Sequence, residues 1–167
     1  VVGNFAHRML TFTAKNFESK VPEGAENSEF QDEVLQVIRE AKEDWDDALD
    51  RQKFREGLEK VLKMTRQGNR LFDQAEPWKS RKSDLSRCGA DLAVLLELVF
   101  ALGVLLKPYL PTSSEKLLST FVSCAPSASD ALELLGTENI LRTGCDLHPP
   151  GIIFPRLELP EDGSDQA

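Results

Sequence analysis

Hydrophobic side chains recur every three or four residues along most of the chain, which is the spacing of one face of an α-helix. This pattern predicts a first helix over residues 1–17, a second over about 28–49 and a third over about 50–73. The segment Val21-Pro22-Glu23-Gly24 separates the first two, because proline removes a backbone donor and glycine permits unusual backbone angles. The first half of the chain is therefore predicted to be helical.

The most apolar part of the sequence lies in a predicted helix over residues 85–106, which Lys107-Pro108 ends. Its apolar run, Leu92 to Leu106, has 15 residues and carries Glu97 in its middle. A helix that crosses a membrane needs about 20 largely uncharged residues. We therefore expect this helix to be the buried core of a bundle, and we expect no membrane association.

Shorter helices are predicted over about 113–123 and over 127–135. Helix starts are suggested by polar residues that can accept backbone N–H bonds. Ser28 with Gln31 and Thr112 with Glu115 fit capping boxes, and Asp50 is placed to cap the third helix.

The C-terminal segment changes character after Pro149-Pro150-Gly151. Residues 152–157 are apolar but interrupted by proline, which predicts an extended segment packed on the bundle. We expect one domain over residues 1–159 and a disordered acidic tail over residues 160–167. The predicted fold class is all-α: an antiparallel helix bundle with an extended C-terminal segment packed on it.

Charge is distributed unevenly along the chain, whose formal net charge is −8. Residues 23–50 hold eleven acidic and two basic side chains, a net of −9, whereas residues 51–87 hold eleven basic and five acidic side chains, a net of +6. Such asymmetry lets one side of a domain face an anion, although a charged helix face is more often simply solvated.

The chemistry-bearing residues give little sign of catalysis. Cys88, Cys124 and Cys145 form no CxxC pair and are odd in number, so we expect reduced thiols. His7 and His148 have no ligands at metal-site spacing, which argues against zinc. We assign no catalytic residue, and we expect a cytoplasmic protein because no secretory signal is present, although import of the parent into an organelle stays open.

Four short strings carry a resemblance to a known family. They are Gly3-Asn4-Phe5-Ala6-His7-Arg8-Met9-Leu10-Thr11-Phe12, then Gly68-Asn69-Arg70 leading into Glu76-Pro77-Trp78-Lys79, then Leu106-Lys107-Pro108-Tyr109-Leu110-Pro111-Thr112, and Ile153-Phe154-Pro155-Arg156-Leu157-Glu158. In this order and with these separations, the chain resembles the C-terminal anticodon-binding domain of methionyl-tRNA synthetases. The Glu-Pro-Trp-Lys string is most similar to the eukaryotic and archaeal branch.

The resemblance implies reading of the CAU anticodon of methionine tRNA in support of ATP-dependent methionylation. The parent would be a class I aminoacyl-tRNA synthetase whose catalytic domain carries a His-x-Gly-His signature and a Lys-Met-Ser-Lys-Ser loop, neither of which occurs in this chain. We therefore expect no catalysis and no cofactor in this fragment. ATP and Mg²⁺, with Zn²⁺ as a further candidate, would belong to the catalytic half.

The family's anticodon readers fall on Asn4, Arg8 and Trp78, with Asn69, Asp73 and Pro77 as expected neighbours and Lys79 as a weaker candidate. His7 departs from the asparagine common there in the family. From the residues alone, Asn4 and Arg8 stand four apart on one helical face, where both can donate to a base edge or a phosphate. An indole at a helix end can stack an unpaired base.

Other interpretations of the same residues stay open. Asn4 would otherwise be a helix-packing amide, Arg8 a surface ion-pair partner and Trp78 a core anchor. The alternatives at the level of function are the anticodon-binding domain of another class I synthetase, or a protein-interaction module that kept the bundle but lost RNA binding. Expected partners are methionine tRNA, the catalytic domain of the same polypeptide and proteins of a synthetase complex.

Overall fold

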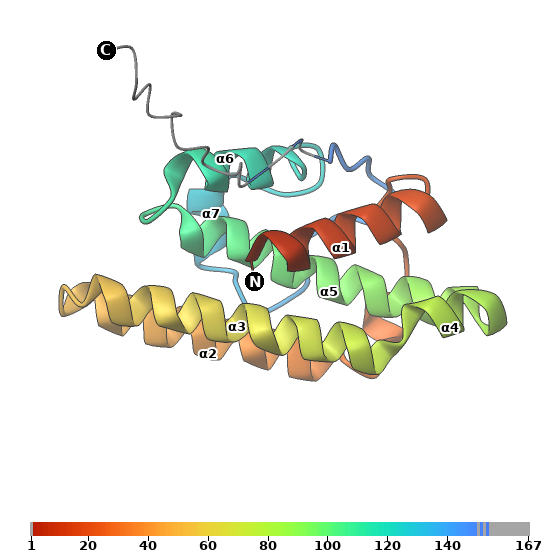
Figure 1. The fold of residues 1–167 in the computed structure, drawn as a ribbon, viewed down its shortest axis with the longest axis horizontal. Helices are drawn as coiled ribbons and strands as arrows, with labels where there is room; N and C mark the ends of the chain where they lie inside the picture. The colour runs from red at the N-terminus through yellow and green to blue at the C-terminus, as the bar shows by residue number, and fades with distance from the viewer. Residues whose placement is uncertain (1, 150, 152, 154–167) are drawn as a thin grey trace, which may run out of the picture.

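The computed structural model describes residues 2–149, 151 and 153, and within them the chain is helical (Figure 1). The only extended pairing among these residues is the isolated bridge between Lys20 and Asp146. The predicted all-α helix bundle is therefore confirmed. Its helices are α1 (Val2–Asn16), the 3₁₀ turn η1 (Ala25–Asn27), α2 (Gln31–Asp50), α3 (Phe54–Ala75), α4 (Pro77–Ser83), α5 (Leu85–Leu106), α6 (Pro111–Ser119) and α7 (Ala128–Leu132).

Helix α5 is the centre of the bundle. Every residue from Cys88 to Leu106 is buried, as predicted for a core helix. Helix α5 is long and apolar enough to cross a membrane by length and composition alone, but its apolar window is buried inside the bundle. It contacts η1 and every α-helix described, with the antiparallel pair α2 and α3 along one side and α1 and α6 along the other (Figure 1). The other helices are amphipathic because each has to bury one face against α5.

Two carboxylates on α5 are buried and each holds a distant segment. Asp91 accepts a hydrogen bond of 2.6 Å from the Ser28 hydroxyl, and the Glu97 carboxylate accepts one of 2.8 Å from the backbone N–H of Leu141. Burial raises the pKa of both groups, and it raises the pKa of Glu97 to about 7. Glu97, which stood out in the apolar run, therefore anchors the C-terminal part of the chain to the core.

Helices α1 and α3 approach closely where the Phe5 ring packs against Gly68. A Cβ atom placed on Gly68 would lie 2.7 Å from Cζ of Phe5, which is too close for two carbon atoms. Phe5 and Met9 of α1 are buried, whereas Val2 and Phe12, which recur at the same helical spacing, are partly buried. The glycine thus sets the separation between the two helices.

Three predicted helix caps are wrong, each for a local reason. The Ser28 hydroxyl donates to buried Asp91, and α2 begins at Gln31 with no side-chain cap. Asp50 lies in the last turn of α2 instead of capping α3. Helix α6 begins at Pro111, ahead of the predicted Thr112 cap, because proline fits the first helical position without a free N–H.

Helix ends also differ from prediction. Residues 77–83 form α4, a helix that was not predicted, and α6 ends at Ser119, short of residue 123. The short helix after Ser127 is confirmed, although it ends at Leu132. The Ser127 hydroxyl accepts a hydrogen bond from the backbone N–H of Asp130.

The C-terminal segment is described only in part. Ile153 is buried, and its carbonyl accepts a 3.2 Å hydrogen bond from the Ser113 hydroxyl of α6, in keeping with the segment predicted to pack on the bundle. The rest of that segment, the domain boundary at residue 159 and the predicted tail over residues 160–167 lie outside the described residues.

The prediction of three reduced cysteines is wrong for two of them. Cys124 and Cys145 form a disulfide, and only Cys88 is free and buried. Their separation of 21 residues matches no motif. The turn after α6 and the segment that Glu97 anchors meet only in the folded chain, so cysteine spacing could not reveal the pair.

The contact between Gly68 and Phe5 predicts the effect of a single added methyl group. Gly68→Ala is expected to destabilise the domain by about 1–3 kcal/mol, because either the Phe5 ring or the helices must move. Urea unfolding measures this change. Adding Phe5→Leu, which removes the clashing ring atoms, should make the Gly68→Ala change cost less than it does in the wild-type background. Equal unfolding midpoints for wild type and Gly68→Ala would contradict the close packing.

The raised pKa of Glu97 predicts a pH-dependent stability. The folded state binds a proton at Glu97 up to about pH 7, whereas the unfolded chain releases it near the ordinary value of 4.5. The contribution of protonated Glu97 to the free energy of unfolding is therefore fully present below pH 4.5 and is lost as pH rises through 7. The free energy of unfolding falls by about 3 kcal/mol over this range. Glu97→Gln does not titrate, and its side-chain oxygen still accepts the Leu141 N–H.

Relative to wild type, Glu97→Gln should therefore gain stability as pH rises from about 5 to 8. Urea unfolding at several pH values in this range measures the difference. Glu138→Gln, at an exposed position, is the matched control and should keep a constant difference from wild type. A pH-independent difference for Glu97→Gln would contradict the assignment.

Candidate nucleic-acid interface

Asn4 and Arg8 are exposed one turn apart on α1, because the residues next to them, Phe5 and Met9, turn inward to the core. This is the shared face that their spacing predicted. Asn4 projects from α1 toward solvent, and His7 beside Arg8 lies 3.5 Å from the Thr11 hydroxyl. The departure at His7 therefore leaves the Arg8 side chain undisturbed.

Three groups from α3 hold the Arg8 guanidinium. It donates to the Asn69 carboxamide oxygen at 3.2 Å and to the Asp73 carboxylate at 2.8 Å, and its central carbon lies 4.7 Å from the centre of the Phe72 ring. The Arg8 and Asp73 side chains keep 42% and 58% exposure, so the ion pair contributes at most about 1 kcal/mol to stability. The contact fixes the direction of the guanidinium more than it stabilises the fold.

Trp78 joins this cluster through Phe72. The two ring centres lie 6.1 Å apart at 61°, and Phe12 packs edge-on against the same phenylalanine at 6.1 Å. The Trp78 side chain is 40% exposed, so the indole is supported from below and open to solvent. We name Arg8, Asn69, Phe72, Asp73 and Trp78 the Arg8–Trp78 cluster.

The corner between α3 and α4 positions the indole. Glu76 adopts a left-handed backbone with φ 44°, ends α3 and starts α4, and Pro77 occupies the first helical position. Pro77 is buried, and its carbonyl accepts a 3.6 Å hydrogen bond from the Cys88 thiol of α5, whose pKa burial raises. The corner is therefore tied to the core, and Trp78 follows it directly.

The structure thus brings together four of the six predicted site residues. Arg8, Asn69, Asp73 and Trp78 form one surface, which Asn4 extends along α1, whereas Pro77 lies beneath it as a support. Lys79, the weaker candidate, forms an ion pair of 2.6 Å with Glu76. The interpretation of Arg8 as an ion-pair partner also holds, because Asp73 is its partner in the free protein.

Sequence reasoning missed Phe72 as a member of the Arg8–Trp78 cluster, and it missed Arg81 as a link between two helices beside it. Phe72 falls in the predicted third helix and was given no role at the site, yet its ring contacts both Arg8 and Trp78. The Arg81 guanidinium donates to the Asn16 carboxamide at 3.0 Å and links α4 to the end of α1. All three contacts join residues more than five positions apart, so helical spacing could not reveal them.

The charge asymmetry seen in the sequence is partly neutralised inside the fold. Acidic residues before and on α2 pair with basic residues of α3 and α5, in the pairs Asp44–Lys60, Glu33–Arg70 and Glu29–Arg87. Among the residues that the structure describes, Lys63, Arg66, Arg81 and Lys82 of the basic segment form no ion pair. Part of the basic charge therefore stays available to an anionic ligand.

The Arg8–Trp78 cluster offers a planar cationic fork, a carboxylate, an amide and an open indole face. Such groups recognise unpaired bases, whose edges accept and donate hydrogen bonds and whose faces stack on aromatic rings. Within the described part of the chain, no group of three His, Cys, Asp or Glu side chains is placed to hold a metal ion. The surface is suited to binding.

Comparison with known proteins agrees with this description. The family described as "Anticodon binding domain of methionyl tRNA ligase" matches residues 21–164. A methionine–tRNA ligase of Pyrococcus abyssi is 40% identical over 116 residues, 70% of this chain and 16% of the relative. One from Bacteroides fragilis is 34% identical over 158 residues, 95% of this chain and 23% of the relative.

A solved structure has the same fold. The free-state methionyl-tRNA synthetase of Mycobacterium tuberculosis superposes with a TM-score of 0.81 at 28% identity, covering 95% of this chain and 32% of that one. The helical bundle and the matched family together place the chain in the class of anticodon-binding domains. Within that class, this chain belongs to the anticodon-binding domains of methionyl-tRNA ligases.

The family match decides between the functional alternatives drawn from the sequence. It favours the methionyl family over the related domains of other class I synthetases and over an interaction module without RNA binding. The relatives include both archaeal and bacterial enzymes, so the eukaryotic and archaeal branch stays a prediction. The chain spans less than a third of the length of the relatives compared.

The position of Phe72 predicts a spectroscopic effect on its neighbour. In a Trp45→Phe background, which leaves Trp78 as the single tryptophan, Phe72→Leu should shift the indole emission to longer wavelength, because the indole loses its ring support and meets more water. Phe12→Leu is the matched control. It removes an aromatic ring that packs on Phe72 but leaves the contact between Phe72 and Trp78 in place, so the indole emission should not shift. Unchanged emission in Phe72→Leu with intact helicity would show that Phe72 does not position Trp78.

Proposed function

We propose that this domain recognises the CAU anticodon of methionine tRNA and so supports methionylation by a catalytic domain elsewhere in the same polypeptide. ATP and Mg²⁺ chemistry, with Zn²⁺ as a further candidate, would then belong to that catalytic domain, and the parent would work in the cytoplasm. Proteins of a synthetase complex would be further partners. The observation that supports the proposal best is the Arg8–Trp78 cluster, in which a cationic fork and an open indole share one aromatic support.

Each side chain has a distinct role in this proposal. The indole of Trp78 stacks a base that has left the anticodon loop, while the Arg8 guanidinium donates to a base edge or to a phosphate. Asp73 and Asn69 hold the guanidinium ready, so little side-chain freedom is lost on binding. Asn4, one turn away on α1, supplies a carboxamide that can both donate and accept.

The net charge of −8 makes salt dependence part of the proposal. Phosphate contacts by a few unpaired basic side chains provide attraction that added salt removes. The isolated domain should therefore bind RNA weakly and best at low salt. Specificity should depend on the cluster, and overall affinity should depend also on the catalytic domain through its own contacts with the tRNA.

The proposal predicts discrimination by the first anticodon base. Fluorescence anisotropy at low salt compares a labelled stem-loop that carries CAU with one that differs only at its first base, and the CAU loop should bind more tightly. Trp78→Ala should weaken CAU binding about 5- to 150-fold, which corresponds to loss of one stacked base. Arg8→Ala should also weaken it, and the preference between the two loops should shrink in both variants.

Matched controls separate recognition from general surface effects. Phe54→Ala removes another exposed aromatic ring, 59% exposed at the start of α3, and Arg55→Ala removes an arginine whose side chain is 92% exposed. Neither should change CAU binding appreciably. Equal weak binding of both loops by folded protein would contradict anticodon reading by this domain.

A further inference from the structure

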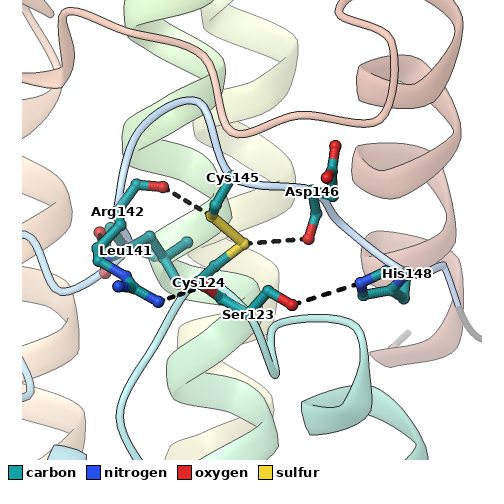
Figure 2. Close-up of a disulfide and its surroundings, with 8 residues drawn as sticks. Ser123, Cys124, Leu141, Arg142, Cys145, Asp146 and His148 are labelled. Carbon is teal, nitrogen blue, oxygen red and sulfur yellow. Dashed lines mark hydrogen bonds between the residues drawn. A yellow bond between two sulfur atoms is a disulfide. The ribbon is translucent and has the colours of Figure 1, made fainter.

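The disulfide between Cys124 and Cys145 lies where three separate segments meet (Figure 2). Cys124 is in the turn that follows α6, and Cys145 is in residues 141–148, which we name the C-terminal strip. The third segment is the linker of residues 17–21, which continues from α1. Neither sulfur belongs to the Arg8–Trp78 cluster, and the proposed RNA recognition does not use them.

Backbone hydrogen bonds surround the disulfide on both sides. Three backbone hydrogen bonds join the linker to the strip. Val21 N–H donates to the Cys145 carbonyl at 3.1 Å, and Gly144 N–H donates to the Val21 carbonyl at 2.8 Å. Leu147 N–H donates to the Ser19 carbonyl at 2.7 Å. The turn after α6 accepts a bond of 2.9 Å from Arg142 N–H at the Cys124 carbonyl. The disulfide thus reinforces a junction that the backbone already forms.

The same junction can hold two thiols. The Cys145 sulfur lies 2.8 Å from the Arg142 carbonyl oxygen, and the Cys124 sulfur lies 3.3 Å from the Asp146 carbonyl oxygen (Figure 2). Both oxygens are acceptors for an S–H group once the disulfide is reduced. Reduction therefore leaves each thiol near a carbonyl acceptor, while the two sulfurs move from bonded to non-bonded distance.

The two sulfurs differ in access. Cys124 is fully buried, whereas Cys145 is partly exposed between the exposed residues Gly144 and Asp146. A small thiol reagent can therefore reach Cys145 first, with Cys124 placed behind it as the resolving cysteine. Cys88, the remaining cysteine, is buried beside the α3–α4 corner, where its thiol donates to the Pro77 carbonyl.

We propose that Cys124 and Cys145 form a reversible thiol–disulfide staple, which closes by exchange with a small-molecule disulfide of the glutathione type. The Cys145 thiolate attacks one sulfur of oxidised glutathione, which gives a mixed disulfide and releases one glutathione thiolate. The Cys124 thiolate then attacks the Cys145 sulfur and releases the second glutathione thiolate. The protein loses two electrons and two protons, and oxidised glutathione becomes two molecules of reduced glutathione.

Closing the staple restrains the C-terminal strip against the linker and the turn after α6. The loop that it closes spans 21 residues and includes α7, so cross-linking removes freedom chiefly from the unfolded chain. The linker begins one residue after α1 ends at Asn16, so the restraint acts next to the helix that carries Asn4 and Arg8. The staple is independent of RNA binding, and its test needs no RNA.

The test equilibrates the folded chain in glutathione buffers from fully reduced to fully oxidised, traps free thiols with an alkylating reagent and weighs the protein. Two cysteines should lose their label together as the buffer becomes oxidising, while the third stays labelled after denaturation. Dithiothreitol should restore all three labels in folded protein. Cys88→Ser should behave like wild type in losing two labels, and Cys145→Ser should keep both of its remaining thiols.

Several outcomes would overturn the proposal. They are three labelled thiols at every glutathione ratio, stable mixed disulfides without closure, and a disulfide that dithiothreitol cannot reduce without unfolding. A second measurement uses the wild-type chain in its two states. Oxidation should raise the thermal midpoint by about 5–10 °C and slow exchange of the Val21, Gly144 and Leu147 amide protons. Cys145→Ser should show neither change, and equal midpoints and exchange in both wild-type states would contradict a staple.

Discussion

Burial of α5 on every side is the constraint from which the rest of the architecture follows. The residues of α5 from Cys88 to Leu106 are all buried and have to be covered all round, so α1, α2, α3, α4 and α6 all lie against this helix (Figure 1). Covering α5 places α1 beside α3, and Gly68 lets the Phe5 ring close that contact. The exposed side of α1 then presents Arg8 to Asn69 and Asp73, and the α3–α4 corner places Trp78 against Phe72.

The Arg8–Trp78 cluster, the candidate binding surface, is held by weak interactions on a stable helical core. The exposed ion pair of Arg8 with Asp73, its contact with the Phe72 ring and the aromatic contact with Trp78 each contribute on the order of 1 kcal/mol. Substitutions at exposed Arg8 and Trp78 should therefore change binding without unfolding the domain. Gly68 and Glu97, by contrast, belong to the frame, and substitutions there change stability first.

Much of the fold could be predicted because α1, α2, α3 and α5 each have an apolar face with helical spacing, and α5 matched its predicted bounds of residues 85–106. The cap predicted at Ser28 was wrong because a hydroxyl can either cap a helix or bond to another side chain. Only the fold shows the buried Asp91 carboxylate to which the Ser28 hydroxyl donates. The disulfide was not predicted for a similar reason, because its two cysteines meet only through tertiary structure.

The candidate site could be predicted from a resemblance and not from spacing. Periodicity placed Asn4 and Arg8 on one face, but the partners of Arg8 are more than sixty residues away on α3. The role of Phe72 was hidden because an aromatic residue at a core position needs no further explanation. Only the folded chain shows that its ring also supports Arg8 and Trp78 at the surface.

Recognition as proposed requires that a base of the anticodon loop stacks on the Trp78 indole. Its most direct test is a titration of the Trp45→Phe protein, in which Trp78 is the single tryptophan, with unlabelled stem-loop RNA while the indole emission is followed. Stacking predicts saturable quenching by the CAU loop, with weaker quenching at equal concentration by a loop that differs at the first anticodon base. Binding of the CAU loop, observed by an independent method, with no change in indole emission would contradict the account.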